Sequence, residues 1–99
     1  MTLEDLKAEI FQPWLGSRFQ IQLGASSDLA LILAECVTAG MAPAGSSRAP
    51  FRLLFHGPLR PVLPQAIYRL VHEEMGALDI FIVPIGPEGD SMRYEAIFT

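Results

Sequence analysis

The chain lacks several features that would point to a particular chemistry. It has one cysteine, Cys36, in 99 residues, which excludes an intrachain disulfide and a cysteine-rich metal site. Its seven Lys and Arg are scattered, and nucleic acids are bound through clustered basic residues, so no nucleic-acid partner is expected. No apolar run approaches the roughly 20 residues needed to cross a bilayer, so no membrane partner is expected. These absences predict a cytoplasmic protein.

Apolar residues are abundant for so short a chain. They make up 51% of the sequence, charged residues only 18%, and the mean hydropathy is +0.33 with a net charge of -4. A chain of this length forms one domain, residues 1–99, with one modest core. The surplus of apolar residues predicts either strands covered on both faces or apolar surface that meets a partner.

Short apolar runs bounded by Gly or Pro predict a mainly β fold. The central stretch has three such runs, Phe51–Phe55, Ile67–Val71 and Leu78–Ile85, and the polar segment His72–Ala77 joins the last two as a hairpin. Further strands are expected at Arg18–Leu23, which alternates strictly, and at Met92–Phe98. We predict a small antiparallel β-barrel or sandwich of five to six strands within residues 17–99.

The remaining segments are read from their periodicity and turn residues. Residues 1–12 predict one N-terminal helix of two to three turns, because Leu3, Leu6 and Ile10 share a helical face and Pro13 ends it. Leu29–Val37 has helical propensity but follows a hairpin-like turn, so we predict a strand. Four segments are predicted as turns, loops or extended surface chain: Gly40–Ala49, His56–Pro58, Leu59–Gln65 and Pro84–Asp90.

Four polar side chains are the candidates for a catalytic or ligand-binding pocket. His56, His72, Glu74 and Tyr94 could supply acid–base groups if the fold gathered them within hydrogen-bonding reach. The sequence shows no nucleophile motif beside either histidine and no third metal ligand near His72. The structural interpretation, in which His56 fixes a turn and His72 ends a strand beside a solvated acidic loop, is therefore favoured, and neither a metal nor another cofactor is expected.

An interaction surface is predicted on the strand that contains Leu78, Ile80, Phe81 and Ile82. Leu78, Ile80 and Ile82 share one face and Phe81 lies on the other with Asp79, so both faces are apolar over most of the strand. The barrel's own core can cover one face. A short helix covers little of the second, so a homo-oligomer or a complex with another protein is expected.

The second half of the chain resembles a bacterial family of domains of unknown function. Members of that family carry patterns such as PFSLLFRGP, LPQGTYRLEH and FLVPVGP followed by GMRYEAVF, and the matching segments here are Pro50–Pro58, Leu63–His72, Phe81–Pro87 and Ser91–Phe98. Ala66 and Val71 depart from the pattern, where the family often has Gly and Glu. The resemblance implies a genomic setting near proteins similar to phage tail-collar or short tail-fibre proteins, and hence an accessory or assembly role.

Two functional hypotheses follow from the sequence. The favoured one is a non-catalytic interaction or assembly protein, because the sequence has no catalytic motif. The alternative is a small-molecule-binding or hydrolytic β-barrel that uses the four polar residues named above. Their separation in the structure distinguishes the two hypotheses.

Overall fold

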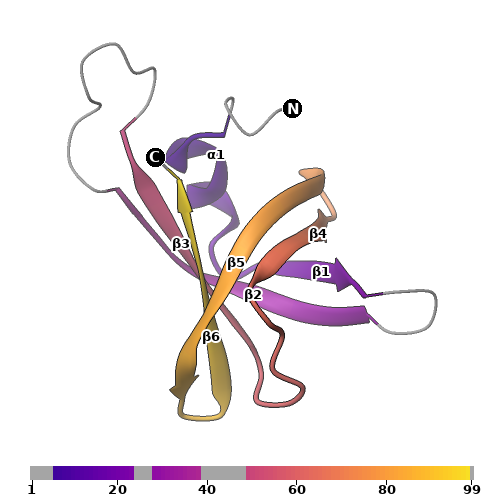
Figure 1. Ribbon diagram of the computed structural model, residues 1–99. Helices are drawn as coiled ribbons and strands as arrows, with labels where there is room; N and C mark the ends of the chain where they lie inside the picture. Colours follow the sequence, from indigo (N-terminus) through magenta and orange to yellow (C-terminus); the bar gives the residue numbers. More distant parts are fainter. Residues whose placement is uncertain (1–5, 24–27, 39–48, 99) are drawn as a thin grey trace.

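The computed structural model describes residues 6–23, 28–38 and 49–98 (Figure 1). Its elements, in chain order, are α1 (Ala8–Phe11), the 3-10 turn η2 (Gln12–Trp14), β1 (Arg18–Gln22), β2 (Asp28–Thr38), β3 (Phe51–Pro58), β4 (Ala66–His72), β5 (Gly76–Glu88) and β6 (Ser91–Phe98). The predicted mainly β class, with one short N-terminal helix, is confirmed.

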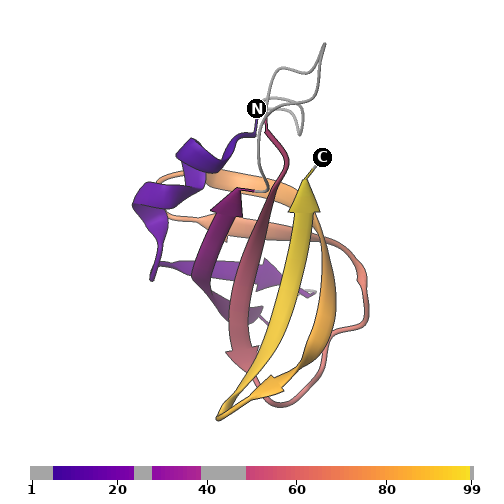
Figure 2. The same cartoon turned by 90° about the vertical axis from the view of Figure 1, so that its left-hand side faces the viewer.

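The six strands close into an antiparallel barrel, which decides between the barrel and the sandwich. The strand order around it is β1-β2-β3-β6-β5-β4. The closure between β1 and β4 is short, with two paired positions, Gln20 with Val71 and Ile21 with Leu70. By contrast, β3 and β6 pair along their whole lengths (Figure 2).

Leu29–Val37 forms a strand, as predicted, although its Leu and Ala residues have helical propensity. It lies within β2, which pairs with β1 on one side and β3 on the other. Leu31 and Leu33 are fully buried in the core. Hydrogen bonding to two neighbouring strands and burial of the inward leucines stabilise the strand. Together they outweigh the helical preference of this segment, which is about 0.5 kcal/mol per residue.

Two segments predicted as turn or loop are strands, and those predictions were wrong. His56–Pro58 continues β3, and β5 runs through Pro84 and Pro87 to Glu88, so that Gly89 and Asp90 alone form the turn. The last β4 partner of β5 is Ala66, opposite Ile82. Beyond that pair β5 has one edge without a partner among the described residues, and a strand with such an edge tolerates proline. A bulge after Pro84, with Gly86 at a φ of 106°, absorbs the remaining misfit.

The helical segment is shorter than predicted. Residues 1–5 lie outside the described part of the chain, Leu6 and Lys7 are not helical, and α1 makes one turn before η2. It lies at the end of the barrel where β6 ends (Figures 1 and 2). There the ring of Phe11 packs 6.0 Å from Phe51 and 6.1 Å from Phe98, between centroids. The helix therefore closes the core at one barrel end instead of covering an outer sheet face.

Two further predictions concern the connections. The loop predicted at Gly40–Ala49 lies outside the described residues except for Ala49. The hairpin predicted at His72–Ala77 is confirmed, with its turn at Glu73–Met75 and with Gly76 at a φ of 80°.

Candidate functional site

Of the four residues predicted to form an interaction surface, three lie inside the barrel. Leu78, Ile80 and Ile82 are 5%, 1% and 0% exposed and belong to the core. Phe81 points outward and is 50% exposed. Their assignment to an accessible surface is thus corrected for the first three, which are held inward by the pairing of β5 with β4, and Phe81 alone remains available to a partner.

Phe81 has an apolar neighbour that the sequence interpretation missed. Ile67 of β4 is its direct cross-strand partner and is 67% exposed. Side chains at such paired positions have Cβ atoms about 5 Å apart, so the two form one apolar patch on the outer side of the barrel. An isolated exposed apolar residue needs no explanation, but two paired large ones are more unusual.

Four more outward side chains of β4 and β5 extend this surface along the two strands. The strand register pairs Arg69 with Asp79, and Val71 with Ala77. We call the six residues the β4–β5 face: Ile67, Arg69, Val71, Ala77, Asp79 and Phe81. It has an apolar row, a charged row and a row of smaller apolar side chains.

The charged row is a cross-strand ion pair. Arg69 Nε donates a hydrogen bond to Asp79 Oδ1 at 3.2 Å, and both side chains are more than half exposed. This hydrogen bond, with the charge of Asp79, raises the pKa of Arg69. Arg69 therefore stays charged at neutral pH, and both side chains are accessible to charges on another molecule.

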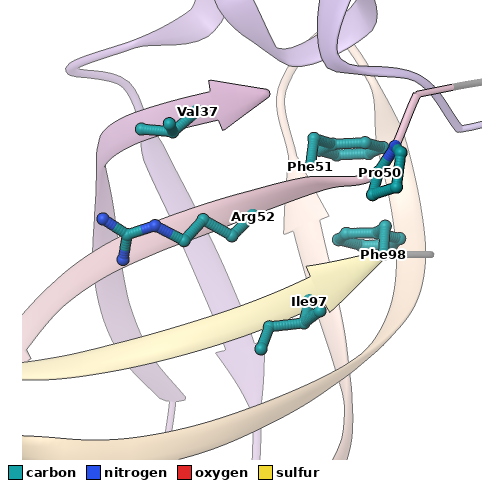
Figure 3. A pocket seen from close by; sticks show the side chains of 6 residues that line it. All are labelled: Val37, Pro50, Phe51, Arg52, Ile97 and Phe98. Atoms are coloured by element: carbon teal, nitrogen blue, oxygen red, sulfur yellow. The ribbon is translucent and has the colours of Figure 1, made fainter. Parts of the chain in front are cut away.

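A groove lies on a second part of the outer surface, where β2, β3 and β6 lie side by side (Figure 3). Its volume is about 200 Å³, and its lining is almost entirely apolar: Val37, Pro50, Phe51, Arg52, Ile97 and Phe98. The Arg52 side chain, the one charged group in this lining, donates from Nη1 to Glu95 Oε2 at 3.1 Å. Pockets for small-molecule ligands commonly span about 300–1,000 Å³, so this groove suits one apolar side chain better than a whole ligand.

His72 and Ser17 form a hydrogen-bonded pair that looks like part of a hydrolase site. His72 Nε2 lies 2.9 Å from Ser17 Oγ. The other ring nitrogen, Nδ1, accepts hydrogen bonds from the amides of Glu74 and Met75, at 2.9 and 3.1 Å. A ring nitrogen that accepts a hydrogen bond carries no proton. In the neutral ring the proton is therefore on Nε2, which donates a hydrogen bond to Ser17 Oγ.

The direction of this hydrogen bond is the opposite of what nucleophilic catalysis requires. A general base must accept the serine proton, whereas here Ser17 Oγ accepts from His72 and donates to the carbonyl of Trp14. The imidazole is 4% exposed and packs between rings, with centroids 4.6 Å from Phe19 and 4.9 Å from Trp14. The pair fixes the chain after η2 onto the β4–β5 turn, and Trp14 covers it.

The four residues of the alternative hypothesis are not gathered around one pocket. His56 points outward from β3, 4.0 Å from Glu88. Tyr94 is fully buried in the core, and its hydroxyl accepts a hydrogen bond from the amide of Leu63 at 2.9 Å. The Glu74 side chain is exposed at the hairpin turn. The cluster that the alternative hypothesis requires does not form. In the pairing of β3 with β6, Tyr94 lies opposite Phe55 and faces the core, whereas His56 is the next residue along β3 and points to the other side of the barrel wall.

The other reactive groups in the described part of the chain do not add a site. Within residues 6–23, 28–38 and 49–98, no three His, Cys, Asp or Glu side chains form a group that could hold a metal ion. Burial, followed by the charge of Glu9, raises the pKa of the Cys36 thiol, which lies 3.6 Å from the carbonyl of Ala8. A thiol in this setting is kept protonated, away from its reactive form. The described helices include none long and apolar enough to traverse a bilayer.

Comparison with known proteins assigns the chain to a family without giving an activity. The sequence model of a family described as a domain of unknown function, DUF6916, matches residues 6–98. The chain belongs to this family. No curated protein and no solved structure matches the chain significantly. The family match covers every strand of the barrel, so the β4–β5 face lies wholly within the DUF6916 domain.

Proposed function

We propose that this DUF6916 protein is a non-catalytic interaction or assembly protein that binds another protein chain through its β4–β5 face. The observation that carries the proposal is the exposure of Ile67 and Phe81 as direct cross-strand neighbours, at 67% and 50%. Covering these side chains removes apolar surface from water, which stabilises a complex by about 25 cal/mol per Å² buried. The ion pair of Arg69 and Asp79 beside them supplies polar contacts that fix the orientation of a partner.

The size of the groove over β2, β3 and β6 supports protein binding over binding of a small molecule. At about 200 Å³ with an apolar lining, it can receive a single side chain of a partner. Partner binding commonly depends on a few such anchored side chains. Ile97 at its edge is 65% exposed, which adds a second apolar contact outside the β4–β5 face.

The alternative, a hydrolytic or ligand-binding barrel, has less support. His72 is committed to two backbone amides and donates to Ser17, so it has no free nitrogen with which to accept a substrate proton. His56 and Tyr94 lie on opposite sides of the barrel wall. The noncatalytic role is therefore the better interpretation of these residues.

We propose that the assembly in which the protein takes part is phage-tail-like and includes a tail-collar or short tail-fibre protein. The support for this choice is the genomic setting implied by the resemblance of the sequence motifs. We also propose a cytoplasmic location, supported by the single cysteine in 99 residues. In that setting the domain would act during assembly, before or while the fibre proteins come together.

The test is quantitative affinity capture from cells that make the protein naturally. Tagged wild type is compared with Phe81→Ser, which removes the largest side chain of the β4–β5 face. The matched control is Val62→Ser, because Val62 is 49% exposed but lies between β3 and β4, off the face. The proposal is supported if wild type and Val62→Ser capture a partner that Phe81→Ser does not capture. The purified partner must also bind purified wild type. Equal retention by all three proteins overturns it.

A further inference from the structure

The pattern of the β4–β5 face is complementary to itself. Its three cross-strand rows are, in order along the strands, Ile67 with Phe81, Arg69 with Asp79, and Val71 with Ala77. The middle row carries one positive and one negative charge, so the face is neutral on a chain of net charge -4. We propose that a second copy of this chain occupies the face, as a symmetric homodimer. This inference rests on the proposed function, because it names the partner of the same surface.

One two-fold arrangement satisfies every row. Let the two-fold axis run parallel to the strands and midway between β4 and β5. Then β4 of one copy lies over β5 of the other, and each cross-strand row lies over the same row of the other copy. Ile67 then contacts the other copy's Phe81, and Arg69 meets the other copy's Asp79. A two-fold interface is isologous, so each contact occurs twice.

The other face-to-face arrangement is excluded by charge. An axis that runs across the strands would place β4 over β4, so that Arg69 would face Arg69 and Asp79 would face Asp79. Like charges in contact at an interface cost several kcal/mol. The ion-pair row therefore selects the parallel axis, and aligned sheet faces pack in this way in β-sandwiches.

The size of the face sets the strength expected for the dimer. Five residues of a strand span about 17 Å, and neighbouring strands lie about 4.8 Å apart. Such a face is well below the roughly 800 Å² per partner of standard stable interfaces. Association should accordingly be weak, and it must be measured over a wide concentration range, about 1–500 μM.

A charge-exchange experiment tests the arrangement. Arg69→Asp has two acidic groups in the middle row and Asp79→Arg has two basic groups, so each variant repels its own copy. An equimolar mixture of the two variants restores two opposite-charge contacts across the two-fold axis. Sedimentation equilibrium should show a concentration-dependent dimer for wild type, monomers for each variant alone, and a dimer for the mixture.

Folding and the remaining outcomes are controlled separately. Both substituted side chains are exposed, at 58% and 57%, and circular dichroism with a urea midpoint checks that each variant folds. A wild type that stays monomeric at all concentrations overturns the dimer, as does a mixture that fails to associate. The proposed function is judged independently. If wild type is monomeric but Phe81→Ser loses a captured partner, the β4–β5 face is still a binding surface. Its partner is then a different protein and not a second copy.

Discussion

Ile80 and Phe81 are adjacent in β5 but point to opposite sides of the barrel wall, so substituting each by alanine should have very different effects on stability. Ile80 is 1% exposed and lies in the core, whereas Phe81 is 50% exposed. Ile80→Ala removes three carbon atoms from the interior, which costs about 2.4 kcal/mol in transfer free energy at ~0.8 kcal/mol per methylene. The residual cavity raises the expected loss to about 3–4 kcal/mol.

The same calculation for Phe81 gives a smaller value. A fully buried Phe contributes about 1.5–3 kcal/mol, so half-burial corresponds to about 1 kcal/mol, including its contact with Ile67. In a domain of this size each kcal/mol lowers Tm by about 4–8 °C. Thermal unfolding at low micromolar concentration should therefore show a decrease in Tm of about 12–32 °C for Ile80→Ala and about 4–8 °C for Phe81→Ala. Equal decreases would refute the assignment of the two faces of β5.

Three further substitutions test the packing around the barrel. Gly57→Ala should lower the free energy of unfolding by about 1–3 kcal/mol, because a Cβ there would lie 2.6 Å from Leu31 Cδ2. Adding Leu31→Ala should reduce that penalty in a double-mutant cycle measured by urea unfolding, and full additivity would contradict the clash. Tyr94→Phe should cost about 1–3 kcal/mol by urea unfolding, since it leaves the buried amide of Leu63 without its acceptor; an unchanged midpoint would mean that this hydrogen bond is replaced. Burial raises the pKa of the Cys36 thiol, so the folded protein should react with iodoacetamide at pH 8 more slowly than the urea-unfolded chain, and equal rates would show an accessible thiolate.

The fold class could be predicted from the sequence because apolar period and turn residues agree over most of the chain. The strict alternation of Arg18–Leu23 locates β1, and the short runs at Phe51, Ile67 and Leu78 begin in or near three other strands. The strands that were missed, at His56–Pro58 and Pro84–Glu88, lie in segments predicted as turn or loop from their prolines and glycines. Pro84 and Pro87 lie in a strand because β5 has no partner on one edge there, and the presence of such an edge depends on how far β4 extends.

The catalytic alternative could not be decided from the sequence for a similar reason. Whether His72 acts as a base depends on the direction of its hydrogen bonds, and those depend on a turn that returns the amides of Glu74 and Met75 to its ring. The pairing with Ser17 crosses 55 residues of sequence. No local pattern predicts that contact, so the sequence left a histidine with two interpretations where the structure leaves one.

The interaction surface, by contrast, has a signal in the sequence that could have located it. The side chains of β5 alternate between two faces of the strand. One face carries Leu78, Ile80 and Ile82, and the other carries Asp79 and Phe81. Judged by its large apolar residues alone, either face could be the interior one. An unpaired carboxylate inside a small barrel is very unfavourable, because burial penalises its charged form. Asp79 therefore fixes its own face, Phe81 included, as the outward one. The same reasoning applied to Arg69 in β4 directs Ile67 outward. A charged residue that alternates with large apolar ones thus marks a strand face that is solvent-accessible and still apolar, which is the combination a binding surface requires.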